Sequence, residues 1–99
     1  MANYLLTNKA VEDLSAIWAY TLDSWSESQA DKYYYMLLEC CQDLADNKIL
    51  GKPYPEISEE ILGIRSGQHI IFYRTTRNKM TEIIRILHGR MDLRKRLHE

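Results

Sequence analysis

The sequence predicts an α+β fold in which an antiparallel two-helix hairpin packs on a curved sheet. Between residues 7 and 45, apolar side chains recur at steps of three and four, which is the pattern of amphipathic helices. Between residues 60 and 90, short apolar runs alternate with polar turns, as in a three-stranded antiparallel meander. The 99 residues suffice for one domain with one modest core, so we expect a single domain over residues 1–99.

The chain begins with a short apolar segment, Asn3 to Leu6, which predicts a first strand. Thr7 or Asn8 can cap the following helix, because a side-chain oxygen there accepts a free backbone N–H. We expect the helix to pack through one apolar stripe formed by Val11, Leu14, Trp18, Leu22 and Trp25.

A polar break around residues 24–28 separates this helix from the next, and Ser26 followed by Gln29 fits a capping box. Because the break is short, the two helices should run antiparallel. Cys40 and Cys41 are adjacent and rarely bridge in a helix, so we expect two reduced thiols in or near the core. The second helix has its own apolar stripe, Ala30, Tyr34, Leu37, Cys41 and Leu44.

Residues 47–60 contain both prolines and predict a loop. Three strands should follow, at Glu60–Arg65, at His69–Thr75 and from about residue 81 to His88. Arg85 interrupts the last strand, which predicts that one of its faces is incompletely covered. Residues 90–99 read as a short basic C-terminal helix.

The charge is divided unevenly along the chain. Residues 1–61 carry 4 Lys/Arg against 11 Asp/Glu, and residues 62–99 carry 9 against 3. The basic half favours an acidic partner such as nucleic acid, although the two halves can also simply neutralise each other. No apolar run approaches the roughly 20 residues of a membrane span, and the N-terminus lacks a signal-peptide pattern, so we expect a cytoplasmic protein.

No high-specificity catalytic, phosphate-binding or metal-binding motif is present, so we expect neither a cofactor nor a metal. The best candidate for chemistry is the end of the last strand, where His88, Gly89 and Arg90 leave the sheet together. A histidine there could act as general base in phosphodiester cleavage, with Arg65, Arg74 or Arg85 binding the phosphate. Alternatively, the His88 ring packs on the helix hairpin or caps the tail helix.

Several groups of residues resemble those of one protein family. The pattern A-x-x-D-L-x-x-I-W-x-Y runs from Ala10 to Tyr20, and Trp25, Gln29-Ala30-Asp31 and Tyr34 follow it. Later positions that match are Gly63-Ile64-Arg65, Gly67, Ile71, Tyr73-Arg74, Ile86-Leu87-His88-Gly89-Arg90 and Asp92. From Leu6 to Leu93 the chain resembles the ParE branch of the ParE/RelE superfamily, the toxins of bacterial type II toxin–antitoxin modules.

This resemblance implies a toxin that inhibits DNA gyrase, blocks replication and thereby stabilises plasmids. RelE-like relatives instead cleave mRNA on the ribosome, which here would employ His88, Arg65 and Arg85. The middle strand has aliphatic residues where the nucleases place a phosphate-binding arginine, and this weakens the nuclease alternative without excluding it. A third alternative is an inactive homologue that only binds an antitoxin.

The resemblance also implies a cognate antitoxin, expected to be of the ribbon-helix-helix type and encoded upstream, in a hetero-oligomeric complex. Aromatic residues on the helices are the candidate antitoxin contacts: Tyr20, Tyr33 and Tyr35. Basic residues of the strand ends and tail are the candidate gyrase contacts: Arg65, Arg74, Arg85, His88, Arg90, Arg94, Lys95 and Arg96.

Overall fold

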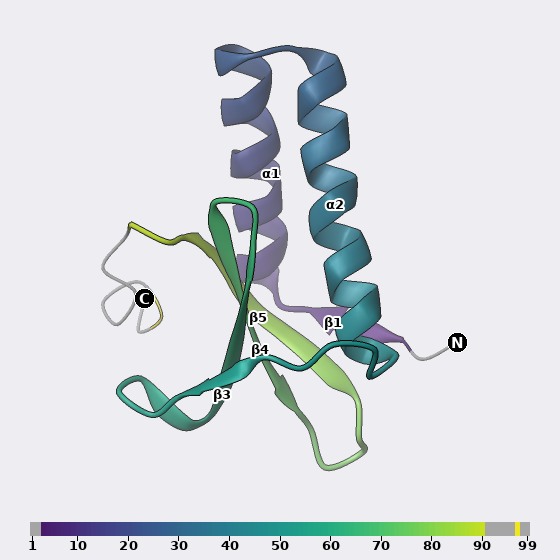
Figure 1. The fold of residues 1–99 in the computed structure, drawn as a ribbon, viewed down its shortest axis with the longest axis vertical. Coiled ribbons are helices and arrows are strands. Elements are labelled where there is room, and N and C mark those ends of the chain that lie inside the picture. The colour runs from purple at the N-terminus through teal and green to yellow at the C-terminus, as the bar shows by residue number, and fades with distance from the viewer. Residues whose placement is uncertain (1–2, 91–96, 98–99) are drawn as a thin grey trace.

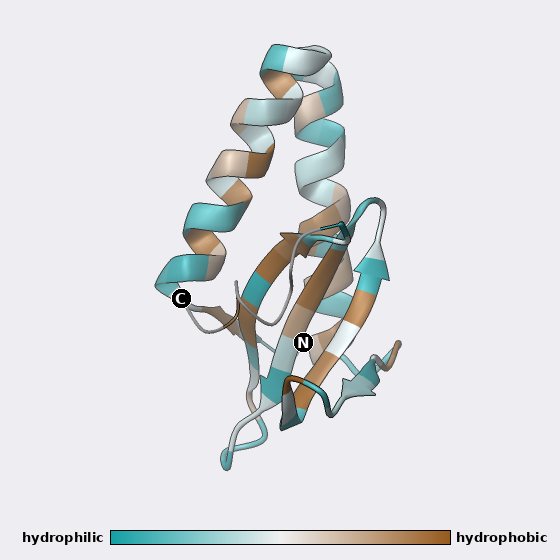
Figure 2. Cartoon of the chain, turned by 90° about the vertical axis from the view of Figure 1, so that its left-hand side faces the viewer, coloured by the Kyte–Doolittle hydropathy of each residue, from teal (hydrophilic) through white to brown (hydrophobic). Residues whose placement is uncertain are grey.

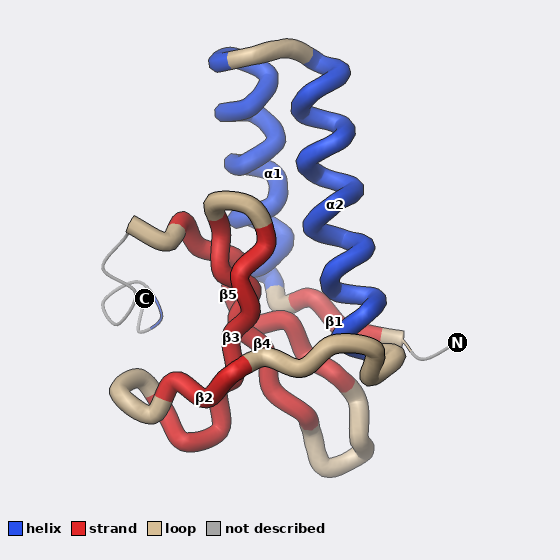
Figure 3. Tube along the Cα trace, in the orientation of Figure 1, coloured by secondary structure: helices blue, strands red, loops and turns tan. Residues whose placement is uncertain are grey.

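The structure is a computed structural model that describes residues 3–90 and Leu97. Two long helices form a hairpin beside a twisted five-stranded sheet (Figures 1 and 3). In chain order the elements are β1 (Tyr4–Leu6), α1 (Asn8–Ser24), α2 (Glu27–Ala45), β2 (Lys52–Tyr54), β3 (Ser58–Ser66), β4 (His69–Thr75) and β5 (Thr81–His88). The predicted C-terminal helix falls, apart from Leu97, outside the described residues.

The sheet has the strand order β1-β5-β4-β3-β2. The predicted meander is confirmed as β3, β4 and β5, which pair antiparallel, while β1 pairs parallel to β5. The connection from β1 to β5 contains the helix hairpin and the strands β2 to β4, so it is long enough for a parallel pair. The prediction of a loop throughout residues 47–60 is wrong, because Lys52–Tyr54 pairs with β3. Pro53 is tolerated there because β2 is an edge strand, where a missing N–H need not interrupt a ladder.

Both faces of the central strands are covered. On one face, side chains of the hairpin such as Leu14, Leu37 and Cys41 pack against Ile71 and Ile83. On the other face, Ile70, Phe72 and Leu87 form a second cluster, to which Tyr54, Ile57, Ile61 and Leu97 add partly buried side chains. Figure 2 shows the result as hydrophobic colour along the bodies of these strands and hydrophilic colour in the turns. Both thiols are free, and burial raises the pKa of Cys41 to about 12.

The apolar stripe predicted for α1 is largely wrong, whereas the stripe of α2 is mostly buried as predicted. Trp25 is 76% exposed and Val11 is 47% exposed, and the buried residues of α1 are Ala10 and Leu14. Val11 lies in the near half, beside the buried face formed by Ala10 and Leu14. The far half of the hairpin projects beyond the sheet, so the apolar side chains there have no second layer to pack against (Figure 1). Both predicted caps are present, since Thr7 accepts from the N–H of Ala10 and Ser26 from that of Gln29.

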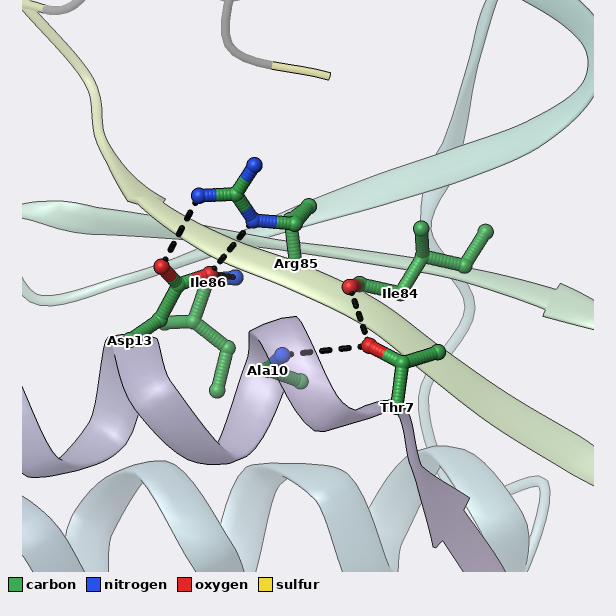
Figure 4. A network of polar contacts seen from close by, with 6 residues as sticks. All are labelled: Thr7, Ala10, Asp13, Ile84, Arg85 and Ile86. Carbon is green, nitrogen blue, oxygen red and sulfur yellow. Dashed lines mark hydrogen bonds and ion pairs between the residues drawn. The ribbon is translucent and has the colours of Figure 1, made fainter. Parts of the chain in front are cut away.

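The near half of α1 is tied to β5 by polar contacts at two points (Figure 4). Asp13 Oδ2 accepts from Arg85 Nε at 2.8 Å and from the N–H of Ile86 at 3.0 Å, and Asp13 Oδ1 accepts from Arg85 Nη2 at 3.0 Å. Thr7, besides capping the helix, donates its hydroxyl to the carbonyl of Ile84 at 2.7 Å. We call the contacts of Asp13 with Arg85 and Ile86 the carboxylate clamp.

The clamp corrects the prediction that Arg85 marks an uncovered face of β5. Arg85 is only 8% exposed, because α1 crosses directly over it and supplies Asp13 as its counter-ion. A buried guanidinium requires such a partner, since an uncompensated charge in the interior is strongly destabilising.

We therefore predict that Asp13→Asn lowers the free energy of unfolding by about 3 kcal/mol, because it removes the negative charge that faces the buried Arg85 guanidinium at 2.8 Å. Urea titration followed by circular dichroism measures the change. Glu12→Gln is the matched control, since this neighbouring carboxylate is exposed and its loss should cost less than about 0.5 kcal/mol. Equal stability of the two variants would contradict the assigned role of Asp13.

Candidate functional site

The pairing of β4 with β5 brings two histidines together at one end of the sheet. His69 is the cross-strand partner of His88, and their rings meet edge to face with centroids 5.3 Å apart. The Arg65 side chain from β3 lies against Gly89, where an added Cβ would come within 3.2 Å of Arg65 Nη1. We call the group Arg65, His69, His88, Gly89 and Arg90 the histidine corner.

His69 is held by a tyrosine from the helix hairpin. Tyr33 Oη lies 2.6 Å from His69 Nδ1 and accepts the backbone N–H of Gln68 at 2.9 Å. Burial is the main cause that lowers the pKa of His69 to about 4, and the neighbouring His88 lowers it further, while Asp13 acts in the opposite direction. His69 is therefore a neutral imidazole at physiological pH, and the Nδ1 of a neutral ring can accept a hydrogen bond from the Tyr33 hydroxyl.

His88 is oriented by the backbone that follows it. The N–H of Arg90 donates to His88 Nδ1 at 3.1 Å. Because a backbone amide can only donate, Nδ1 carries the lone pair and a neutral His88 carries its proton on Nε2. Neutral His88 thus presents an N–H donor at Nε2, and its one basic nitrogen is already occupied. This arrangement suits binding of a hydrogen-bond acceptor better than proton abstraction.

A hollow of about 420 Å³ lies between α1 and the histidine corner. The α1 side supplies apolar surface and a tyrosine, and the strand side supplies imidazoles and one guanidinium-bearing residue. The lining residues are Ala16, Ile17, Tyr20, His69, His88 and Arg90. Such a hollow can accommodate an apolar group against α1, attached to a negatively charged group or a carbonyl that faces the strand side.

The remaining predicted contact residues do not all join this corner. Arg85 is paired with Asp13 in the interior and has little surface to offer a target. Arg74 lies towards the opposite end of β4, where its Nε donates to Glu82 at 2.7 Å and its Nη1 is 3.9 Å from Glu60. Three further predicted residues, Arg94, Lys95 and Arg96, lie outside the described residues.

The three tyrosines predicted to contact an antitoxin also separate. Tyr20 and Tyr35 are 71% and 65% exposed, as an accessible contact surface requires. Tyr33 is half-buried and hydrogen-bonded to His69, so it supports the histidine corner from the hairpin. Burial raises the pKa of Tyr33, and the Gln68 amide and Arg65 partly oppose this rise.

Sequence reasoning missed two residues of the site. His69 was identified only as the first residue of the middle strand, because its place opposite His88 depends on a register shift between Phe72 and Tyr73 in the pairing of β4 with β5. Asp13 was not identified as a buried residue, although it lies one turn from both Ala10 and Ile17 on the face of α1 that packs on β5. An acidic residue on that face, together with a single arginine in a buried strand, is the sequence signal of a buried ion pair.

Within residues 3–90 and Leu97, no group of three or more His, Cys, Asp and Glu side chains is placed to hold a metal ion. Over the same residues, neither helix is both long enough and apolar enough to cross a membrane.

Comparison with solved structures shows that another chain shares this fold. The structure superimposes with a TM-score of 0.76 on a chain from the "Chromosomal ParDE TA system from P. aeruginosa", at 23% identity over 89% of this chain and 96% of that one.

Sequence relatives point to the same class. Toxin ParE1 of Mycobacterium tuberculosis is 33% identical over 97% of this chain and 98% of its own length. Toxin ParE1 of Caulobacter vibrioides is 33% identical over 98% of this chain and 99% of its own length. Toxin ParE of Escherichia coli is 31% identical over 98% of this chain and 94% of its own length. The protein is thus a toxin of the type II toxin–antitoxin class. Residues 4–93 match the family described as "ParE toxin of type II toxin-antitoxin system, parDE", and the chain belongs to this family.

The low pKa of His69 predicts a pH-dependent stability. Because its pKa falls from 6.5 in the unfolded chain to about 4 in the folded protein, the unfolded chain binds the proton first as the pH drops. The contribution of neutral His69 to the free energy of unfolding is therefore full above pH 6.5 and is lost as the pH falls from 6.5 to 4. The free energy of unfolding should fall by about 1 kcal/mol less between pH 7 and pH 5 in His69→Gln than in the original protein. Urea titration at each pH measures it. Identical pH profiles for both proteins would show that His69 is not held neutral.

Proposed function

We propose that this protein inhibits DNA gyrase by binding it, and that a cognate antitoxin neutralises the inhibition. Membership of the ParE toxin family over residues 4–93 is the observation that carries the proposal. The orientation of His88 supports a binding mechanism, because its Nε2 offers a donor and its Nδ1 is occupied. The inhibitor is therefore expected to act without catalysing a reaction of its own.

The proposed target surface is the histidine corner. Arg65 and Arg90 are exposed, and neutral His88, bonded to the Arg90 amide, offers a donor nitrogen beside them. Gyrase bound to DNA presents negative charge to which such a surface is complementary. The basic residues Arg94, Lys95 and Arg96 follow Arg90 within a few positions in sequence, and we include them in the proposal on charge alone.

A ribosome-dependent mRNA endonuclease is the second candidate. The observation that favours it is the presence of Arg65 and His88 at the same end of the sheet, because a phosphate contact and a histidine are parts of such a site. A homologue that is inactive as a toxin and only binds the antitoxin is the third candidate.

The proposed antitoxin contacts are the exposed tyrosines of the hairpin, Tyr20 on α1 and Tyr35 on α2. An antitoxin of the ribbon-helix-helix type would add a segment that folds on binding and covers these side chains. Large exposed aromatic side chains are typical anchors of such interfaces.

The first test compares the two activities directly. Purified protein is added to a gyrase supercoiling assay and, separately, to a reconstituted translation reaction with primer extension of the mRNA. We predict inhibition of supercoiling and an uncut mRNA. Cleavage of mRNA at the ribosomal A site would establish the nuclease alternative, and the absence of both effects would establish the inactive homologue.

The second test concerns the corner. Arg65→Ala combined with Arg90→Ala should weaken gyrase inhibition about fivefold to tenfold, because each exposed charge contributes up to about 1 kcal/mol to binding. Arg77→Ala is the matched control, since this exposed arginine lies in the turn between β4 and β5, at the other end of the sheet. Equal inhibition by both variants, with unchanged melting temperatures, would remove the corner from the target surface.

The third test concerns the basic tail. Arg94→Ala, Lys95→Ala and Arg96→Ala together should reduce toxicity in a bacterial growth assay and leave a folded domain, because these charges are proposed to act in binding. Full toxicity of the folded triple variant would exclude the tail from the target surface.

A further inference from the structure

A second hollow lies between the two helices, away from the histidine corner. It has a volume of about 360 Å³ and is lined by Ser15 and Trp18 of α1 and by Asp31, Tyr34 and Tyr35 of α2. Three of these five side chains are aromatic. The volume is near the lower end of the roughly 300–1,000 Å³ range of ligand sites, so it fits one side chain rather than a long segment.

The walls of this groove are fixed relative to one another. The indole Nε1 of Trp18 donates to Asp31 Oδ1 at 3.0 Å, which joins the two helices across the groove. The rings of Tyr34 and Tyr35 meet edge to face with centroids 5.8 Å apart at an interplanar angle of 81°. The aromatic rings therefore do not close over the groove as a stack, and Tyr35 remains 65% exposed.

The charge of the groove has one sign. Among the described residues that line it, Asp31 is the only one with an ionisable carboxylate or a basic group. The carboxylate is exposed and can accept further hydrogen bonds beyond the one from Trp18. An exposed carboxylate bordered by an indole and two phenol rings is complementary to a cation that also has a flat, weakly hydrated face.

We propose that this groove binds the guanidinium of an arginine side chain carried by a partner polypeptide. The guanidinium can stack on an aromatic face and at the same time donate to Asp31, whereas a lysine ammonium is a compact, strongly hydrated charge that stacks less well. The mostly acidic sequence of the hairpin favours such a basic partner segment, since residues 8–45 carry 7 Asp/Glu against 2 Lys/Arg. This site is separate from the proposed gyrase surface and does not depend on it.

The protein carries its own reporter and control for the test. Trp18 lines the groove, and Trp25 lies at the end of the hairpin with 76% exposure. The full-length protein is titrated with the blocked peptide acetyl-Gly-Arg-Gly-amide, and both indole N–H resonances are followed by NMR. We expect a saturable shift of the Trp18 resonance with a millimolar dissociation constant, and at most a small linear shift of the Trp25 resonance.

Two comparison peptides test whether binding requires a positive charge and whether it requires a guanidinium. The peptide with citrulline in place of arginine has nearly the same shape without the charge and should bind at least about fivefold more weakly, as expected for loss of a cation–π contact and an ion pair. The peptide with lysine should bind about threefold more weakly than the arginine peptide. Equal affinity for the three peptides, or equal shifts of both tryptophans, would overturn the proposal.

Substitutions test whether Asp31 and Tyr35 of the groove contribute to arginine binding. Asp31→Asn keeps an oxygen that can accept from Trp18 and removes the charge, so arginine affinity should fall about fivefold. Tyr35→Leu removes an exposed ring and should lower the affinity about threefold. Asp23→Asn, at an exposed carboxylate of α1 outside the groove, is the matched control and should bind like the original protein. Unchanged affinity in both groove variants would exclude this groove as the binding site.

Discussion

The carboxylate of Asp13 is the contact that positions α1 on β5 beside the proposed target surface. It neutralises Arg85 and also accepts the backbone N–H of Ile86, so a single side chain of α1 fixes both a side chain and the main chain of β5. Thr7 adds a second attachment one turn and a half earlier. Apolar packing alone would allow α1 to shift along β5, whereas these directional hydrogen bonds set its position along the strand.

This position determines the geometry of the histidine corner. Ile86 is two residues before His88, and Ile17 of α1 is one turn after Asp13 and lines the hollow beside both histidines. The clamp therefore sets the width of that hollow. The corner itself is completed by backbone groups, because the N–H of Gly89 donates to the carbonyl of Gln68 and the N–H of Arg90 donates to His88. A surface built in this way is preorganised for binding, which lowers the entropy that a partner must lose on contact.

Much of the fold could be predicted from local sequence, and the failures have physical causes. Helix caps such as Thr7 and the strand at His69–Thr75 depend on local chemistry and alternation, and they were predicted correctly. The α1 stripe failed because burial depends on what lies opposite a helix, and the far half of the hairpin faces no sheet. The strand at Lys52–Tyr54 was missed because a proline signals a loop, although an edge strand tolerates it. For the site, His88 was found from its place at a strand end, but its neutral partner on the facing strand and the clamp depend on long-range register that local patterns do not encode.

The central claim is that the clamp on β5 holds the histidine corner in its binding geometry. The most direct test is amide hydrogen exchange, resolved by residue, in the original protein and in Asp13→Asn. The account predicts faster exchange not only at Ile86, whose charged acceptor becomes a neutral amide, but also at Gly89 and Arg90, whose amides close the corner. Faster exchange confined to Ile86, with the amides of Gly89 and Arg90 protected as before, would contradict the claim.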